Sequence, residues 1–128
     1  MKTLLLSLTM TVFVSMSAQA QTAGENLKNA TPEQRAQKMT DWMKTNLQLT
    51  DDQVASVHAI NIKYANENET LKDNGAGRRD KYKKFKESQE SKDQELKGAL
   101  TAEQFNDYLS KKKELQQKMR EEVRERRN

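Results

Sequence analysis

Leu49-Thr50-Asp51-Asp52-Gln53 and Leu100-Thr101-Ala102-Glu103-Gln104 repeat one pattern, Leu-Thr-x-x-Gln, and a degenerate copy stands at Ala30-Thr31-Pro32-Glu33-Gln34. In each copy the threonine can cap a helix, because its hydroxyl can accept a hydrogen bond from the backbone N–H of the third helical residue. The glutamine at that third residue can accept one from the backbone N–H of the threonine, which completes a capping box. The three copies therefore predict three helix starts.

The two full copies also carry a leucine before the cap. Val54 and Phe105 stand where they can pack against Leu49 and Leu100 as hydrophobic staples, whereas the degenerate copy lacks this feature. We therefore assign the leucine, threonine and glutamine that the two copies share to helix capping and hairpin geometry. These residues are Leu49, Thr50, Gln53, Leu100, Thr101 and Gln104.

Apolar spacing and chain breaks predict four helices, one short and three long, with no competing strand pattern. The expected ranges are 32 to about 46, 51 to about 73, about 78 to 99, and 102 onward. The clearest break is Asp73-Asn74-Gly75-Ala76-Gly77, whose two glycines are expected to supply positive-φ positions. The fold class is therefore all-α, and the second and third helices, on either side of this break, should form a helical hairpin.

The predicted core is thin. Apolar residues make up 34% of the chain and charged residues 33%, whereas a compact globule of this size normally has more to bury. This balance favours an extended helical hairpin or cradle, which we expect to bury its apolar seams in an intertwined homodimer. The stretch 87–93 of the third helix is almost wholly polar. The evident apolar contact residues of that helix are Tyr82, Phe85, Leu96 and Ala99.

The N-terminus reads as an export signal. Lys2 precedes an apolar run from Leu4 to about Val14, and Ala18-Gln19-Ala20 matches a signal-peptidase site. We expect residues 1–20 to be a signal peptide, 21–30 a flexible leader and 31–128 one helical domain. No second apolar run follows, so the mature chain is expected to be soluble, without membrane insertion.

Few residues of the types that carry out catalysis or bind metal ions occur in this chain. The chain has no cysteine, its single histidine is His58, and Met39, Met43 and Met119 are the methionines after the signal. No Ser-His-Asp order, phosphate-binding glycine loop or HExxH pattern can be assembled. We therefore expect no catalytic residue, no cofactor and no metal site, and we expect that the protein is not an enzyme.

Positive charge gathers at the start of the third helix. The stretch Arg78-Arg79-Asp80-Lys81-Tyr82-Lys83-Lys84-Phe85-Lys86, here called the basic-aromatic segment, holds six basic residues and one acid with two aromatic rings between them. One interpretation is a solvated helix face. The other is a surface that attracts unfolded polypeptide by charge and holds it weakly through the rings. The expected client contacts are Arg78, Arg79, Lys81, Tyr82, Lys83, Lys84, Phe85 and Lys86.

Two Leu-Thr-x-x-Gln copies in a small, charged, exported helical chain resemble the Spy/CpxP family of periplasmic stress proteins. The resemblance implies a cradle-shaped dimer in the periplasm that shelters unfolded or misfolded proteins without ATP during envelope stress. It also implies an alternative, a regulator that binds the sensor domain of a membrane histidine kinase. The client contacts named above come from charge and aromatic placement and are not carried over from the family.

Two other functions fit the sequence less well. Nucleic-acid binding is suggested by a sequence pI near 9.3 and by aromatic residues among lysines, but export and a net charge of only +4 argue against it. A basic periplasmic chaperone of the Skp type would also use long helical hairpins. That family needs a strand-forming body for assembly, and the sequence offers no such segment.

Overall fold

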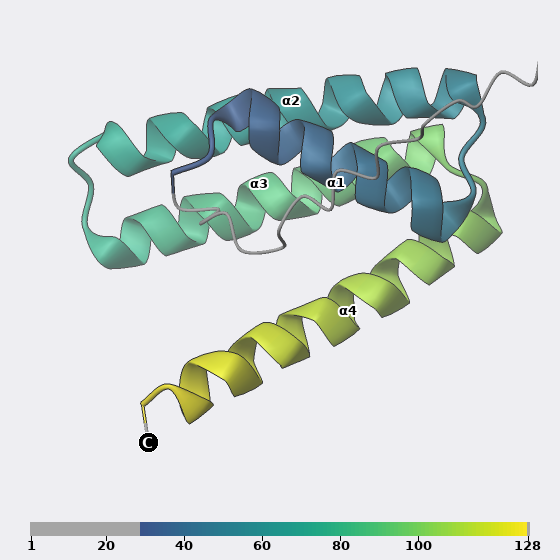
Figure 1. The fold of residues 1–128 in the computed structure, drawn as a ribbon. Coiled ribbons are helices and arrows are strands. Elements are labelled where there is room, and N and C mark those ends of the chain that lie inside the picture. Colours follow the sequence, from purple (N-terminus) through teal and green to yellow (C-terminus); the bar gives the residue numbers. More distant parts are fainter. Residues whose placement is uncertain (1–28, 128) are drawn as a thin grey trace, which may run out of the picture.

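The computed structural model describes residues 29–127, apart from the side chains of Met119, Glu122 and Val123 (Figure 1). Four helices follow one another: α1 (Pro32–Leu47), α2 (Asp51–Asp73), α3 (Arg78–Ala99) and α4 (Ala102–Glu125). Helix α1 has 16 residues and the others have 22 to 24, so the prediction of an all-α fold with one short and three long helices is confirmed. The predicted signal peptide 1–20 and the leader residues 21–28 lie outside the described residues.

All three predicted capping boxes are present. Each threonine hydroxyl accepts a hydrogen bond of 3.2 Å from the backbone N–H of the glutamine three residues on. Each glutamine Oε1 accepts one of 2.9–3.1 Å from the backbone N–H of its threonine. The pairs are Thr31 with Gln34, Thr50 with Gln53, and Thr101 with Gln104. These local bonds fix where α1, α2 and α4 begin.

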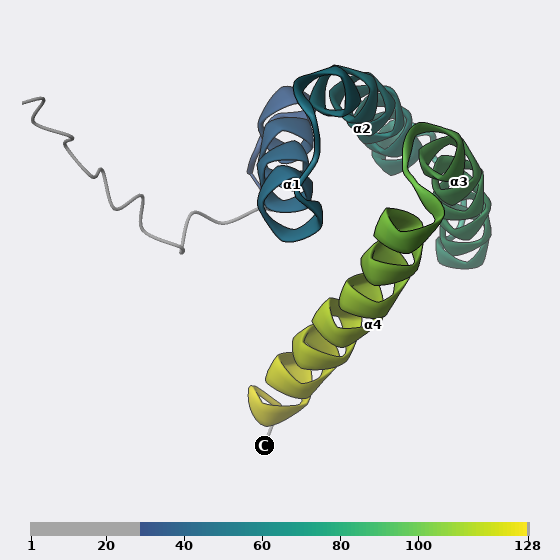
Figure 2. The same cartoon turned by 90° about the vertical axis from the view of Figure 1, so that its right-hand side faces the viewer.

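The helices form a curved layer. Helix α1 packs against α2 and α2 against α3, while no close backbone contact joins α1 to α3 within the described part of the chain. Figure 2 shows these three helices as an arch seen nearly end-on, with α4 leaving the side of α3 and pointing away from the arch. Helix α4 contacts α1 and α3 only sparsely. Most of its length therefore lacks a helical neighbour within the described chain.

The core lies at the end of the layer where α1 and α3 finish and α2 and α4 begin (Figure 1). One apolar cluster there takes residues from all four helices and from both Leu-Thr-x-x-Gln copies. Its buried members are Met43, Leu47, Leu49, Val57, Leu96, Leu100 and Tyr108. Val54 and Phe105 pack against the same cluster as Leu49 and Leu100, as hydrophobic staples require.

The two full motifs meet in this region through their glutamines. Gln53 Nε2 donates to Gln104 Oε1 at 2.6 Å, and Gln104 Nε2 donates back to Gln53 Oε1 at 3.1 Å. Each amide also reaches the end of a neighbouring helix, Gln53 at Ala99 O (3.4 Å) and Gln104 at Leu47 O (3.3 Å). The capping residues are therefore also a tertiary contact between the starts of α2 and α4.

A polar seam crosses the interface of α1 and α2. The Thr40 hydroxyl donates to Ala36 O at 2.8 Å and accepts from Asn61 Nδ2 at 3.0 Å. Since that hydroxyl hydrogen is already used, the 3.3 Å contact with His58 Nδ1 requires the histidine to donate from Nδ1. Asn61 Oδ1 is buried and has no hydrogen-bond partner in the described part of the chain. The single histidine thus packs between helices.

The break between α2 and α3 differs from the prediction at one glycine. Gly75 has φ +66°, the left-handed conformation expected after a helix end, and Asn74 Oδ1 accepts from the Ala76 N–H at 3.1 Å. Gly77 has φ −62° and extended ψ, because it is the N-cap residue of α3. The prediction of a positive φ at Gly77 was therefore wrong, and one glycine suffices for the turn.

Helix α1 ends on a left-handed residue that is not glycine. Gln48 has φ 52°, a conformation in which a Cβ crowds the following carbonyl.

Replacing Gln48 by glycine should raise the free energy of unfolding by about 0.5–1 kcal/mol, since the relieved strain exceeds the added chain entropy. Urea denaturation followed by circular dichroism measures the change. Ala59→Gly, at an exposed interior position of α2, is the control and should lower stability by about 1 kcal/mol. Equal destabilisation by both changes would contradict the explanation.

Candidate functional site

The basic-aromatic segment forms the beginning of α3, at the tip of the α2–α3 hairpin. Lys81 Nζ donates to the backbone carbonyl of Lys72 at 2.8 Å. A lysine ammonium there is favourable, because the last carbonyls of α2 lack helical partners and carry the negative end of the helix dipole. Lys81 therefore helps to close the hairpin in addition to its predicted place in the client-contact set.

A shallow apolar groove lies across the hairpin tip. Its volume is about 300 Å³ and its walls are almost wholly apolar. Asn68, Leu71 and Lys72 of α2 and Lys81, Tyr82 and Phe85 of α3 line it. Tyr82 is 69% exposed and Phe85 44% exposed. The two aromatic residues expected as apolar contacts of the third helix thus face solvent at the edge of a groove.

The other predicted contacts are distributed around α3. Arg78 falls on the groove side with Tyr82 and Phe85, because residues three, four and seven apart share a helix face. Arg79, Lys83 and Lys86 fall on an outer flank, and Lys84 on another. All are exposed, except that Lys81 is half-buried. Lys83 lies 3.9 Å from the carboxylate of Glu87, an exposed i,i+4 pair. The basic side chains of the segment are therefore distributed around the axis of α3, and Arg78 and Lys81 are the ones beside the groove.

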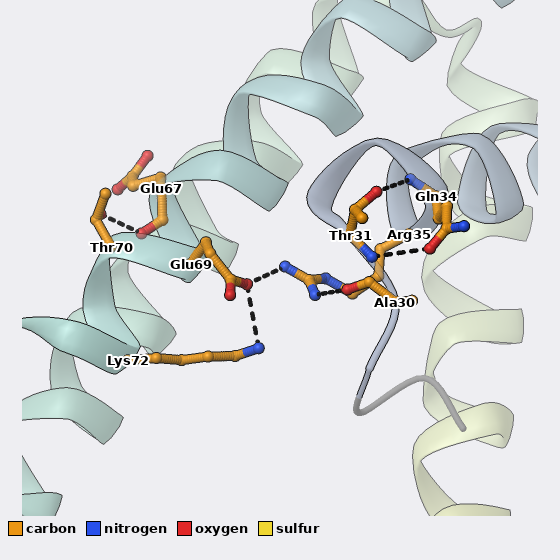
Figure 3. A network of polar contacts seen from close by, with 8 residues as sticks. All are labelled: Ala30, Thr31, Gln34, Arg35, Glu67, Glu69, Thr70 and Lys72. Atoms are coloured by element: carbon orange, nitrogen blue, oxygen red, sulfur yellow. Dashed lines mark hydrogen bonds and ion pairs between the residues drawn. The ribbon is translucent and has the colours of Figure 1, made fainter. Parts of the chain in front are cut away.

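An ion network ties the start of α1 to α2 close to this groove (Figure 3). Arg35 donates to the carbonyl of Ala30 and to the Glu69 carboxylate, which also accepts from Lys72 at 3.1 Å. Arg35, and then Lys72, hold the pKa of Glu69 below its usual value. This stabilisation is present above the ordinary carboxylate pKa and is lost as pH falls through the lowered one. Lys72 belongs both to this network and to the groove wall.

A second network joins α2 to α3. The Glu95 carboxylate accepts from Lys63 and, at 2.7 Å, from the hydroxyl of buried Tyr64. These hydrogen bonds lower the pKa of Glu95, with the Lys63 contact contributing most. The pKa of Tyr64 is raised by burial and by its bond to the carboxylate. These contacts hold the α2–α3 hairpin in register along its length.

Hydrogen bonds and an ion pair at Asp93 join the first half of α4 to α3. Its carboxylate accepts from the Tyr108 hydroxyl at 2.9 Å and from Lys112 Nζ at 3.0 and 2.9 Å. Burial, followed by the nearby Asp93 charge, raises the pKa of Tyr108. We call this corner, formed by Lys92, Asp93, Tyr108 and Lys112, the α3–α4 elbow.

Lys92 is the unexpected member of the elbow. It lies in the stretch that the sequence marks as polar, yet it is only 8% exposed. Burial, reinforced by the charge of Lys112 and opposed by Asp93, lowers the pKa of Lys92 to about 8. The folded state binds this proton less tightly than the unfolded one, so its destabilising effect is complete below that pH and is relieved as pH rises toward 10.5.

Several buried residues are polar and so were not expected in the core. They are Thr40, Asn61, Ser88 and Lys92. Spacings of four residues, which link them to buried Ala36, Val57 and Leu96, are the signal that places them on the apolar faces of their helices. In residues 29–127, no group of three or more His, Cys, Asp or Glu side chains is placed to hold a metal ion.

The fold and surface define an all-α protein of four helices with a basic-aromatic hairpin tip. The chain belongs to the DUF4890 family, described as a domain of unknown function, whose sequence pattern matches residues 18–108. The match covers α1, α2, α3 and both full motifs, and it ends at Tyr108 in α4. No curated protein and no solved structure gives a significant match. None of the described helices has the length and apolar character that a membrane crossing requires.

Proposed function

We propose that the protein is an exported, ATP-independent chaperone of the holdase type, which binds unfolded or misfolded proteins through the basic-aromatic segment. The observation that carries the proposal is the exposure of Tyr82 and Phe85 beside an apolar groove, on a helical segment that carries six basic residues. Apolar side chains that gather at an exposed groove, as these two do, are typical of surfaces that bind a partner. Neither catalysis nor a cofactor is part of this proposal.

The chemistry of the surface suits loose capture. The lysine ammonium and arginine guanidinium groups of the basic-aromatic segment attract polypeptides with acidic segments over distances near the Debye length, about 8 Å at physiological salt. Aromatic side chains then give contacts that tolerate many client sequences. Binding of this kind holds unfolded chains by mass action and needs no nucleotide.

The resemblance to the Spy/CpxP family supports the same function, a periplasmic location and a homodimer. The two Leu-Thr-x-x-Gln copies that carry it meet in the fold through Gln53 and Gln104. Leu109 and Leu115 of α4 are exposed on a helix with few neighbours. A second copy that covered this helix would bury these leucines, which is why we include the homodimer in the proposal.

Charge reversal on the basic-aromatic segment should weaken client binding. In the variant Arg79→Glu, Lys84→Glu and Lys86→Glu, all three positions are exposed, and Lys81 is left in place because it caps α2. We expect affinity for a chemically denatured client to fall about tenfold or more, mainly through slower association, and its salt dependence to weaken. Fluorescence anisotropy of a labelled client at several salt concentrations measures both.

The matched control is Lys113→Glu, Lys118→Glu and Arg120→Glu, which makes the same charge change at exposed positions of α4. It should retain most of the affinity. Equal losses in the two variants would show that net charge alone determines binding. Unchanged affinity and salt dependence in the α3 variant would contradict the assigned surface.

A further inference from the structure

The groove at the hairpin tip combines apolar walls with positive charge. Leu71 of α2 and Tyr82 and Phe85 of α3 supply the apolar side chains. The charged residues that line it are Lys72 and Lys81, and among the described residues no acidic side chain does so. A groove with this lining favours a ligand that is apolar in one part and negatively charged in another.

The cations at the groove differ in how far they are already engaged. Lys72 Nζ lies 3.1 Å from the Glu69 carboxylate (Figure 3), and Lys81 Nζ donates at 2.8 Å to a backbone carbonyl at the end of α2. Arg78 is exposed on the groove side of α3, one turn before Tyr82. Within residues 29–127 its guanidinium makes no ion pair and no side-chain hydrogen bond. Arg78 therefore keeps its charge and its donors for a ligand.

We infer, on the basis of the proposed function, that the groove selects client segments in which a large apolar side chain stands next to an acidic residue. The apolar side chain packs against Leu71, Tyr82 and Phe85, which removes apolar area of both partners from water. The neighbouring carboxylate accepts hydrogen bonds from the Arg78 guanidinium, whose planar fork fits two carboxylate oxygens. Neither half of the contact requires a particular client sequence beyond this pair of residues.

The size and charge of the groove argue against other occupants. A volume of about 300 Å³ is at the lower end of the range for ligand pockets, so the groove suits one large side chain and its neighbours. A lysine or arginine beside that side chain is repelled by the cations at the groove. A neutral segment gains the apolar contact but leaves Arg78 unpaired. The expected order of affinity is therefore acidic, then neutral, then basic.

The test is a titration of the full folded chain, with ¹³C-labelled tyrosine and phenylalanine rings, followed by NMR. The probes are acetyl-Gly-Glu-Phe-Glu-Gly amide and its counterparts with glutamine or lysine in place of both glutamates. Acetyl-Gly-Glu-Ala-Glu-Gly amide, which lacks the ring, is the control for charge alone. We expect saturable shifts at Tyr82 and Phe85, whereas Phe105 and Tyr108, which pack in the apolar cluster, should not respond. The acidic aromatic peptide should bind about tenfold or more tightly than the lysine and alanine peptides.

Arg78→Gln and Arg79→Gln are a matched pair of variants. Both replace an exposed arginine in the first turn of α3, where the helix dipole disfavours a cation, so neither should lower stability. Arg78→Gln should reduce the preference for glutamate over glutamine by about threefold or more and leave the affinity for the glutamine peptide unchanged. Arg79→Gln, on the outer flank of the helix, should keep most of that preference.

The possible outcomes separate this inference from the proposed function, provided that binding of a chemically denatured client is measured on the same samples. Equal affinity for the glutamate and lysine peptides, or equal loss of preference in the two variants, would overturn the inference while the client still bound. A folded chain that bound neither the peptides nor the client would contradict the proposed function as well.

Discussion

Replacing Leu96 by alanine is expected to lower the free energy of unfolding by about 2–5 kcal/mol. Leu96 is fully buried and lies in the one apolar cluster that joins all four helices. Since small domains are stabilised by only about 5–15 kcal/mol in total, this single change should remove a large part of the stability. Urea denaturation followed at 222 nm gives the value.

Leu115→Ala is the control for this prediction. Leu115 is 42% exposed on α4, so its truncation should change stability by no more than about 0.5 kcal/mol in the monomeric chain. Leu96→Ala with an effect as small as that control would mean that the cluster does not hold the fold. A concentration-dependent effect of Leu115→Ala would instead support burial of α4 between two copies.

The second large effect is expected at the paired glutamines. Gln53→Ala and Gln104→Ala should each lower stability by about 1–3 kcal/mol, because each removes a cap acceptor, both hydrogen bonds between the two amides and one hydrogen bond to a helix-end carbonyl. The double variant should lose less than the sum of the two. The difference, a coupling free energy of about 1–2 kcal/mol, is measured by a double-mutant cycle.

Gln34 provides the control pair. It makes the same capping box with Thr31, but it makes no hydrogen bond to another helix within residues 29–127. Gln34→Ala combined with Gln104→Ala should therefore be additive within about 0.5 kcal/mol. Coupling of equal size in both pairs, or none between Gln53 and Gln104, would contradict the tertiary role of the two motifs.

The helix boundaries could be predicted because their signals are local. A capping box joins residues three apart, so Thr50 and Gln53 mark the start of α2 whatever the rest of the chain does. The 51-residue separation between Gln53 and Gln104 carries no comparable signal. Whether two caps touch depends on how the hairpins fold back, which only the tertiary structure determines.

Burial of polar side chains was the main feature that the sequence could not predict. The apolar pattern treats Asn61 as an interruption of a seam and Lys92 as part of a polar stretch, yet both are buried. Asn61 is covered by Thr40 and Met43 of α1, whatever its own polarity. The interior of this protein is therefore more polar than the apolar periodicity of its helices suggests.

The candidate surface was predicted in part. The basic-aromatic segment is contiguous, so its place on one helix follows from the sequence, but the helix distributes its charges around the axis. Leu71 and Lys72 of α2 complete the groove, and they could be found only from the hairpin. Arg35 of α1 forms an ion pair with Glu69 of α2. The α2–α3 hairpin extends beyond this ion pair, and the aromatic rings of Tyr82 and Phe85 there are exposed.

We propose that this chain binds non-native proteins without ATP through Tyr82, Phe85 and the basic residues of the same segment. The most direct test is light scattering of a chemically denatured client diluted into ATP-free buffer, with stoichiometric protein spanning residues 21–128 or its Tyr82→Ser, Phe85→Ser variant. We predict that the wild-type chain suppresses aggregation and that the variant, equally helical, suppresses it much less. No suppression by folded wild-type protein at several-fold excess would contradict the claim and favour the alternative, a regulator of a membrane sensor kinase.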